Sequence, residues 1–281
     1  MDIVPIYKRV IGLDVHQAQI TGCAITEQLE GSVTYERREF DIQNAAPALN
    51  QLSKGGPMLG LQVLQRKRAV GREHAQKFLT VSVANVSDCM SRLFSGSANL
   101  YPMHRGDPMA GPALTVKVRS GDNLMIHKAL EMASPGDVIV VDGGGDLSDA
   151  LIGEIMTGIA QARGVAGFVI YGAIRDARAL KESSFPVFAP GIPHRGPYRD
   201  GPGEVNTIIA INGMVIEPGD LIIGDSDGVL CVPYDQVDTL YAAAIAKSAA
   251  EAKMIEDIQT GKYAAPWVNE SLARLNYLVE N

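Results

Sequence analysis

Two short polar sequences near the middle of the chain combine residue types that could do chemistry. Gly153-Glu154 lies within a stretch of helical periodicity, and Arg175-Asp176 follows a short apolar run at 168–171. Asp176 is a hard oxygen ligand of the kind that Mg²⁺ or Mn²⁺ takes, because such ions use few protein carboxylates and fill their other positions with water and substrate. Arg175 offers a planar guanidinium to a substrate carboxylate or a developing enolate oxygen. Taken alone, an Arg-Asp dipeptide is more often a surface ion pair.

A run of three glycines, Gly143-Gly144-Gly145, follows a second apolar run at 138–142. Glycines permit backbone conformations and close approaches that side chains prevent. A helix that begins shortly after such a loop would direct free N–H groups and its positive dipole end toward an anion. The run is similar to a nucleotide-binding loop, but Ser148 occupies the last glycine position of G-x-G-x-x-G, which disfavours a dehydrogenase or methyltransferase. A tight turn is the simpler alternative.

Alternating strands and helices must position these sequences from about residue 72 onward. Apolar runs predict strands at 114–118, 138–142, 168–171, 207–211, 221–224 and 229–232. Helical spacing of apolar residues predicts helices at 124–132, 151–162 and 237–258. This interleaving indicates an α/β domain, whose chemistry is expected at the ends of strands.

Two turns in this region share a sequence. Pro135-Gly136-Asp137 and Pro218-Gly219-Asp220 each precede an apolar run that ends in Asp and continues into a glycine-containing loop. The repetition predicts two similar turn-and-strand units that serve packing, and it marks where strand ends should lie.

Composition and charge limit the classes of function. The 281 residues are 46% hydrophobic and 20% charged, which is ordinary for a globular chain with a sizeable core. The net charge is −7 and the main basic sequence is short, at 65–68, so no nucleic-acid partner is expected. Cys23, Cys89 and Cys231 lie far apart, which disfavours structural zinc and a disulfide framework. Without a membrane-length apolar run or a signal peptide, we expect a cytoplasmic protein with no membrane partner.

The first 71 residues differ in character from the rest. Residues 10–25 predict two short strands joined by a polar bend, and a third strand is expected at 32–40. From 41 to 71 the periodicity disappears, and Lys54-Gly55-Gly56-Pro57 interrupts regular structure. We therefore divide the chain into an N-terminal segment at 1–40 that contains a β-hairpin, a linker or irregular segment at 41–71, and a main domain at 72–281 with a C-terminal helix.

The polar sequences match a family pattern when they are taken together. Gly153-Glu154, twenty intervening residues and Arg175-Asp176 resemble the G-[DE]-x20-R-D signature of the 4-hydroxy-4-methyl-2-oxoglutarate and 4-carboxy-4-hydroxy-2-oxoadipate aldolases, which share a superfamily with the ribonuclease regulator RraA. Further matches lie at 83–88, 111–113, 213–220 and 225–229. The resemblance covers about 75–262. It implies an α/β/β/α sandwich of the swivelling phosphohistidine-domain-like type, assembled as a homotrimer or homohexamer with sites at subunit interfaces.

The resemblance also implies catalytic roles. Asp176 would bind Mg²⁺ or Mn²⁺ directly, Arg175 would bind substrate and stabilise an enolate, and Glu154 would hold a water of the metal. These three residues would make the protein a class II aldolase that cleaves a 4-hydroxy-2-oxo acid to pyruvate and a second 2-oxo acid. Oxaloacetate gives the same enolate, so its decarboxylation is an expected side activity.

Substrate binding is implied for neighbouring positions. Gly153 and the backbone amides of Ile155 and Met156 would receive the carboxylate of the pyruvyl group. Glu251, with Glu256 as the alternative, would complete the site from a neighbouring subunit.

Two features of the sequence bear on whether the protein is an enzyme and on which substrate it would use. Some RraA-type proteins lack the acidic residue after the glycine and act as non-enzymatic, protein-binding regulators of ribonuclease activity, whereas Glu154 is present here and favours catalysis. The sequence at 194–204 differs from that expected of the characterised aldolases, so the natural substrate can differ from the two named acids.

The start of the chain resembles another family. Ile11-Gly12-Leu13-Asp14-Val15-His16 is similar to the beginning of a DEDD-type, ribonuclease-H-like insertion-sequence transposase, in which Asp14 would match the first metal-binding carboxylate. A single carboxylate cannot assemble a two-metal nuclease site. We therefore expect a fused remnant without nuclease activity.

Overall fold

The structure is a computed structural model that describes the backbone at 9–16, 19–27, 33–41, 59–91 and 99–278, and side chains in the last two of these ranges. The chain divides into two compact units, residues 1–59 and 60–281. In the described ranges, no helix has the length and apolar character that a membrane crossing requires.

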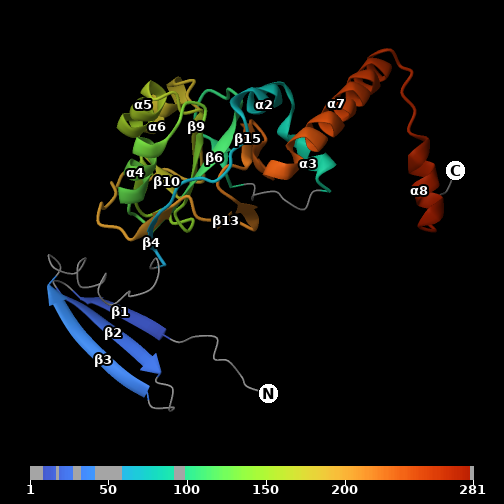
Figure 1. The fold of residues 1–281 in the computed structure, drawn as a ribbon. Coiled ribbons are helices and arrows are strands. Elements are labelled where there is room, and N and C mark those ends of the chain that lie inside the picture. The colour runs from blue at the N-terminus through green and yellow to red at the C-terminus, as the bar shows by residue number, and fades with distance from the viewer. Residues whose placement is uncertain (1–8, 17–18, 28–32, 42–58, 92–98, 279–281) are drawn as a thin grey trace, which may run out of the picture. The chain divides into compact units, whose positions relative to one another are not determined.

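An antiparallel meander forms the first unit (Figure 1). β1 (Arg9–His16) pairs with β2 (Gln19–Glu27), and β2 pairs with β3 (Val33–Asp41). The three strands predicted here are confirmed, with ends that differ by at most two residues. The side chain of Asp14 lies outside the described part of the chain, so the transposase resemblance stays a prediction.

A nine-stranded sheet organises the second unit (Figure 1). Its main path is β16-β15-β6-β7-β9-β11-β5, and β12 pairs with both β6 and β4. Neighbours among β6, β7, β9 and β11 are parallel, whereas β15 is antiparallel to β6 and β16. The strands are β4 (Leu61–Val63), β5 (Tyr101–Pro102), β6 (Met109–Val118), β7 (Val138–Asp142), β9 (Gly167–Tyr171), β11 (Val187–Ala189), β12 (Gly203–Val205), β15 (Leu221–Asp225) and β16 (Gly228–Val232).

Two smaller pairings complete the strands. β8 (Ala150–Ile152) lies parallel to β10 (Ala173–Ile174), and β13 (Ile209–Ile211) forms a hairpin with β14 (Met214–Ile216). The helices are α2 (Arg72–Lys77), α3 (Val83–Cys89), α4 (Leu124–Met132), α5 (Glu154–Ala162), α6 (Ala177–Glu182), α7 (Val237–Gln259) and α8 (Pro266–Arg274), with 3-10 turns η2 (Phe78–Thr80) and η3 (Tyr234–Gln236).

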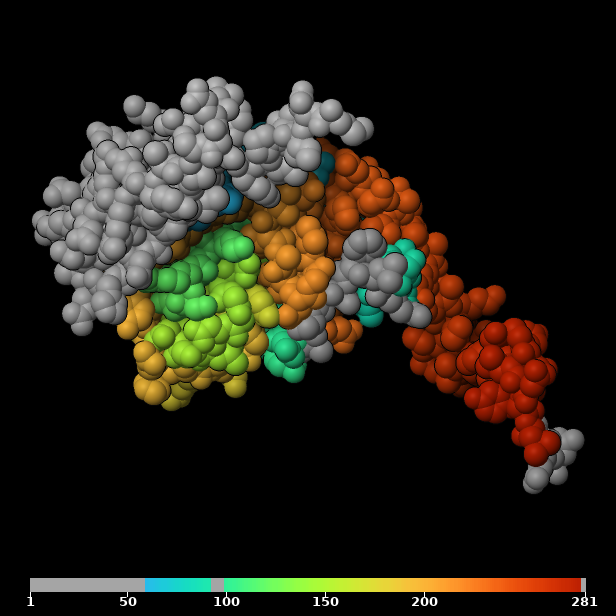
Figure 2. All heavy atoms as spheres, turned by 90° about the horizontal axis from the view of Figure 1, so that it is seen from below, coloured from blue at the N-terminus to red at the C-terminus, as the bar shows by residue number. Residues whose placement is uncertain are grey.

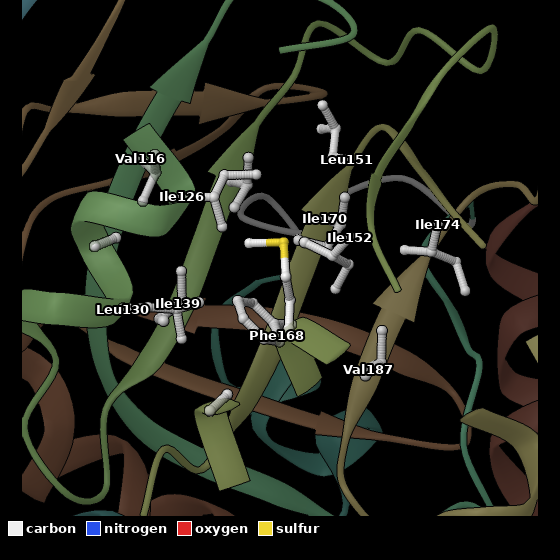
Figure 3. Close-up of a cluster of buried hydrophobic side chains, with 14 of the residues drawn as sticks. Val116, Ile126, Leu130, Ile139, Leu151, Ile152, Phe168, Ile170, Ile174 and Val187 are labelled. Atoms are coloured by element: carbon white, nitrogen blue, oxygen red, sulfur yellow. The ribbon is translucent and has the colours of Figure 1, made fainter. Parts of the chain in front are cut away.

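Alternation along two strands shows how the layers stack. In β7, Ile139 lies in the cluster that α4 and α5 cover (Figure 3), whereas Val140 lies in a second cluster. In β15, Ile222 belongs to that second cluster and Ile223 to a third, which α2, α3 and α7 cover. Because successive side chains of a strand point to opposite faces, two strand layers lie back to back between two helical layers. The predicted α/β/β/α sandwich is confirmed.

The start of one helix was predicted three residues too early. The periodicity at 151–162 predicts a single helix, but Ala150–Ile152 form β8 and α5 begins at Glu154. All three residues of β8 are buried, and a short, fully buried strand has the same apolar pattern as one turn of a buried helix. The glycine run at 143–145 therefore leads into a strand rather than a helix.

The C-terminal helices extend beyond the sandwich (Figure 2). The buried residues of α7 are Val237, Leu240 and Ala244, all near its start, and α8 buries none. The helix predicted at 237–258 is confirmed within one residue.

Residues 60–71, the end of the segment interpreted as a linker, belong to the second unit. Arg66 Nη2 lies 2.8 Å from Asp137 Oδ2, and Arg68 Nη2 lies 3.8 Å from Asp220 Oδ1. Asp137 and Asp220 are both buried and are the acidic residues of the two repeated Pro-Gly-Asp turns. The short basic sequence at 65–68 thus neutralises buried carboxylates of its own chain.

Replacing Arg66 with methionine should destabilise the second unit by about 3 kcal/mol, because it leaves the Asp137 carboxylate buried without its cation. The side chains of Arg66 and Asp137 are 16% and 2% exposed. Urea denaturation would measure the change. Lys128→Met, which breaks the exposed pair with Glu131, is the control and should leave stability unchanged. Equal stability of both variants would contradict the importance of the buried pair.

Candidate active site

A two-stranded parallel pairing brings the two polar sequences together. β8 ends at Ile152, one residue before Gly153, and β10 ends at Ile174, one residue before Arg175. The Arg175 N–H donates to Ile152 O at 3.0 Å, which continues the pairing toward the site. Glu154 is the first residue of α5 and its N–H donates to Asp176 Oδ2, so the start of this helix faces the Arg175-Asp176 sequence. The two polar sequences that the family resemblance assigns to one site therefore lie together in the structure.

Asp176 is held in one orientation by its own backbone and by Glu154. Its Oδ2 atom accepts the Glu154 N–H at 3.0 Å, and Arg175 Nε lies 3.9 Å from the same oxygen. The backbone of Asp176 is left-handed, with φ of 60°, a conformation that Asp tolerates better than most residues. The side chains of Arg175 and Asp176 are both 42% exposed, so both remain accessible to a ligand.

Gly153 is required by close packing rather than by its backbone angles. Its φ of −156° is extended, which any residue can adopt. A Cβ atom at this position would meet Asp176 Oδ2 and would lie 3.1 Å from Arg175 Cγ. The glycine of the Gly-Glu sequence therefore makes room for the Asp176 carboxylate.

Two adjoining pockets share Asp176. The first is lined by Glu154, Asp176, Ala177, Arg178, Ala179 and Glu182. The second is lined by Asn123, His127, Leu151, Ile152, Gly153, Ile155, Met156, Arg175, Asp176, Pro197 and Arg199. Gly153, Ile155 and Met156, predicted to bind a substrate carboxylate, thus lie on the second pocket, where the Met156 N–H already donates to Gly153 O at 3.1 Å.

The predicted C-terminal glutamate is not brought to this site within one chain. Glu251 lies on α7 and accepts from Lys247 Nζ at 3.2 Å, and the same nitrogen lies 3.0 Å from Asp88 Oδ2. Neither Glu251 nor Glu256 lines either pocket. A contribution from a neighbouring subunit stays a prediction.

Three polar residues of the second pocket were not predicted from the sequence: Asn123, His127 and Arg199. Asn123 Oδ1 and His127 Nε2 are buried atoms without a hydrogen-bond partner among the described residues. Arg199 belongs to the unusual sequence at 194–204, whereas Asn123 immediately precedes the predicted helix at 124–132 and His127 lies in its first turn. The positions of these three residues in the chain give no indication that they share a pocket with the Gly153-Glu154 and Arg175-Asp176 sequences.

Comparison with known proteins gives the family. The sequence pattern of the RraA-like family, described as Aldolase/RraA, matches residues 83–231, which is more than half of the chain. The chain belongs to this family. The match includes both polar sequences and the second pocket, whereas the first unit lies outside it.

Relatives of this RraA-like chain carry aldolase names. A protein of Halalkalibacterium halodurans, provisionally named as a 4-hydroxy-4-methyl-2-oxoglutarate aldolase, is 42% identical over 62% of this chain and 82% of its own length. The 4-hydroxy-4-methyl-2-oxoglutarate aldolase of Thermus thermophilus is 33% identical over 48% of this chain and 89% of its own length.

A solved structure of the same family carries a different name. RraAS2 of Streptomyces coelicolor, described as an unusual member of the RNase ES inhibitor RraA protein family, is 26% identical. It matches with a TM-score of 0.60 over 67% of this chain and 98% of its own. The RraA-like fold thus occurs under both enzyme and inhibitor names. The transposase resemblance of the first unit receives no support from these comparisons.

The donor set of this RraA-like site fits a hard divalent cation. Glu154 and Asp176 place two carboxylates on one pocket, and Mg²⁺ commonly takes one or two carboxylates with water in its remaining positions. Among residues 59–91 and 99–278, no three His, Cys, Asp or Glu side chains converge as a closed metal site. The arrangement therefore suits an open site of the Mg²⁺ or Mn²⁺ kind rather than structural zinc.

Arg199→Gln should raise the pKa of His127. Burial is the larger cause that lowers the pKa of this imidazole, the positive charge of Arg199 adds to it, and Glu131 opposes both. Removing the guanidinium removes one of the two lowering causes, so the imidazole should gain its proton at a higher pH. NMR titration of the His127 ring would measure the change, with Arg178→Gln as the control, because the Arg178 side chain is 93% exposed. An unchanged or lower pKa in Arg199→Gln would contradict the proximity of the two groups.

Proposed function

We propose that this chain is a divalent-metal-dependent lyase that cleaves a 4-hydroxy-2-oxo acid into pyruvate and a second 2-oxo acid. The observation that carries the proposal is the Asp176 carboxylate, held by the Glu154 N–H beside Arg175 on a pocket next to the start of α5. The aldolase names of its relatives support the same reaction class. Decarboxylation of oxaloacetate is proposed as a side activity.

Asp176 would hold Mg²⁺ or Mn²⁺ with Glu154 nearby, and the bound ion would act as a Lewis acid toward the 2-oxo group. The chain's own residues would do the rest. Glu154 would accept, through a water molecule, the proton of the C4 hydroxyl group. The C3–C4 bond then breaks, its electron pair gives the enolate of pyruvate, and the C4 oxygen becomes the carbonyl of the second product. Arg175 would stabilise the negative charge of the enolate oxygen until C3 is protonated.

The proposal is tested by pyruvate release from a panel of 4-hydroxy-2-oxo acids and oxaloacetate. We expect release with Mg²⁺ or Mn²⁺, its loss after chelation and its return when the metal is restored. Absence of pyruvate from every acid in the panel, with either metal present, would overturn the proposal.

A non-enzymatic regulator of ribonuclease activity is the second candidate, favoured by the likeness to RraAS2. In that case the site residues would be structural, and inhibition of a ribonuclease would persist in Asp176→Asn. Titration of purified ribonuclease with the wild-type chain and with this variant separates the candidates. Inhibition by neither protein, together with metal-dependent pyruvate release, would exclude the regulator.

We also propose a cytoplasmic homotrimer or homohexamer whose partner is a 2-oxo acid substrate. A neighbouring subunit would then bring Glu251 or Glu256 to the site. Light scattering would give the subunit number. Pyruvate release by mixed assemblies of Glu251→Gln and Asp176→Asn chains would test whether a site is shared between subunits.

A further inference from the structure

Asp122 is a fully buried carboxylate that does not line either pocket of the site. Its Oδ1 atom accepts the Leu124 N–H at 3.0 Å. Its Oδ2 atom accepts the N–H groups of Asp200 at 2.7 Å and Gly201 at 2.9 Å, and Arg119 Nη2 donates to it at 3.2 Å. A buried carboxylate with four donors is fixed in position, and it fixes the groups that donate to it.

The hydrogen bonds of Asp122 join two segments that are almost eighty residues apart in the chain. Tyr198 forms a parallel bridge to Asp122, with its N–H donating to Gly121 O at 2.7 Å and its carbonyl accepting the Asn123 N–H at 3.0 Å. Arg199 therefore lies between two anchored points, the paired backbone of Tyr198 before it and the Asp122-bound amide of Asp200 after it.

Both of the joined segments carry residues of the second pocket. The start of α4 contributes Asn123 and His127, and the loop at 197–201 contributes Pro197 and Arg199. Asn123 Oδ1 and His127 Nε2 are buried and have no hydrogen-bond partner among the described residues, so this part of the pocket offers two polar atoms to a bound molecule. Arg175 lines the same pocket.

We propose that Asp122 is a positioning residue: it fixes the loop at 197–201 against α4, so that Arg199 receives the distal carboxylate of a dicarboxylic 2-oxo acid. This inference rests on the proposed function, in which Arg175 binds the pyruvyl end of the substrate. A second guanidinium on the same pocket then suits a second carboxylate, because Arg matches carboxylates in a two-point geometry. Asp122 acts through Arg199 and does not itself contact substrate.

The test compares the binding of a short and a long dicarboxylate in Mg²⁺ by calorimetry. Oxalate has only the two carboxylates that would bind at the metal and Arg175, whereas 2-oxoglutarate carries a further carboxylate at its far end. We expect Asp122→Asn to weaken 2-oxoglutarate binding by roughly tenfold, since an amide cannot accept from all four donors, and to leave oxalate binding within about twofold. Arg199→Gln should show the same pattern.

Asp137→Asn is the matched control, because Asp137 is 2% exposed and accepts from the Ser134 N–H and Arg66. It should lower stability and leave both affinities unchanged. If Asp122→Asn does not fold, Arg119→Met tests the inference in its place, because the Arg119 side chain is 49% exposed and donates to Asp122. Its loss should also weaken 2-oxoglutarate binding, by a smaller factor.

The outcomes separate the inference from the proposed function. Wild-type protein that binds neither acid in Mg²⁺ would overturn the proposed function and, with it, the inference. Wild-type binding of both acids, with 2-oxoglutarate affinity unchanged in the Asp122 and Arg199 variants, would overturn the inference alone. An equal loss of both affinities in Asp122→Asn would also overturn it, since the residue would then support the whole site rather than Arg199.

Discussion

Asp176→Asn is expected to lower kcat for metal-dependent pyruvate release by on the order of 10³-fold while the fold stays intact. Asparagine is nearly the same size as aspartate and tolerates the left-handed backbone at this position. Its carbonyl oxygen can still accept the Glu154 N–H, which the carboxylate accepts at 3.0 Å. The change therefore removes the negative charge and little else. Steady-state kinetics at saturating metal, with a circular dichroism spectrum of each protein, would measure the effect.

Glu182→Gln is the control for this prediction. Glu182 is another carboxylate that lines the pocket next to Asp176, and its side chain is 67% exposed and paired with Arg178. Its loss should change kcat by less than about threefold if the Asp176 charge is specifically required. Comparable losses in both variants would show that general negative charge at the pocket matters, and a fully active Asp176→Asn would contradict the proposed site.

Gly153→Ala should lower kcat by about 10²-fold, because a displacement near 1 Å of a catalytic group has effects of this size. The added Cβ atom would meet Asp176 Oδ2 directly, so the carboxylate must move away from the Glu154 N–H. The backbone at this position is extended, so alanine adds no strain in φ. The expected defect lies in the position of Asp176, and kinetics together with metal affinity would detect it.

Gly158→Ala, in the helix that Gly153 immediately precedes, is the matched control. A Cβ atom at Gly158 meets no other atom within 4 Å, so the variant should be fully active. It should also be more stable by up to about 1 kcal/mol, because alanine favours a helix interior over glycine. If Gly153→Ala is as active as Gly158→Ala, the close packing of Gly153 on Asp176 does not matter for the reaction.

The family signature pairs the two polar sequences, and the fold brings them into contact. β8 and β10 pair in parallel and each ends one residue before its polar sequence. The sequence could not give this reason, since β8 is three residues long and its apolar pattern extends that of α5. Residue types indicated candidate groups for the site, whereas the strand pairing that joins them became visible only in the structure.

The part of the second pocket that Asn123 and Arg199 line could not be predicted, for a different reason. Asn123 and Arg199 lie far apart in the chain, and the Asp122 carboxylate joins their segments through bonds to the backbone. Backbone donors exist at every non-proline residue, so such contacts leave no pattern of residue types. The unusual sequence at 194–204 contributes Pro197 and Arg199 to the second pocket, but nothing in the sequence indicates that it packs against the start of α4.

The repeated Pro-Gly-Asp turns were predicted correctly as a packing feature. Gly136 and Gly219 both have φ of 93°, which favours glycine, and Asp137 and Asp220 each accept a backbone N–H within their own turn. The basic sequence at 65–68 that neutralises them lies far earlier in the chain. Its charge alone did not show whether this basic sequence would bind an external anion or pair with the buried carboxylates of Asp137 and Asp220.

The central claim is that the Gly153-Glu154 and Arg175-Asp176 sequences face one cation, and anomalous diffraction from crystals soaked in Mn²⁺ and oxalate tests it most directly. We predict an anomalous peak within coordination distance of an Asp176 carboxylate oxygen, on the pocket that Glu154 also lines, with oxalate between the ion and Arg175. Mn²⁺ bound only elsewhere, with the Asp176 carboxylate contacting protein groups alone, would contradict the account.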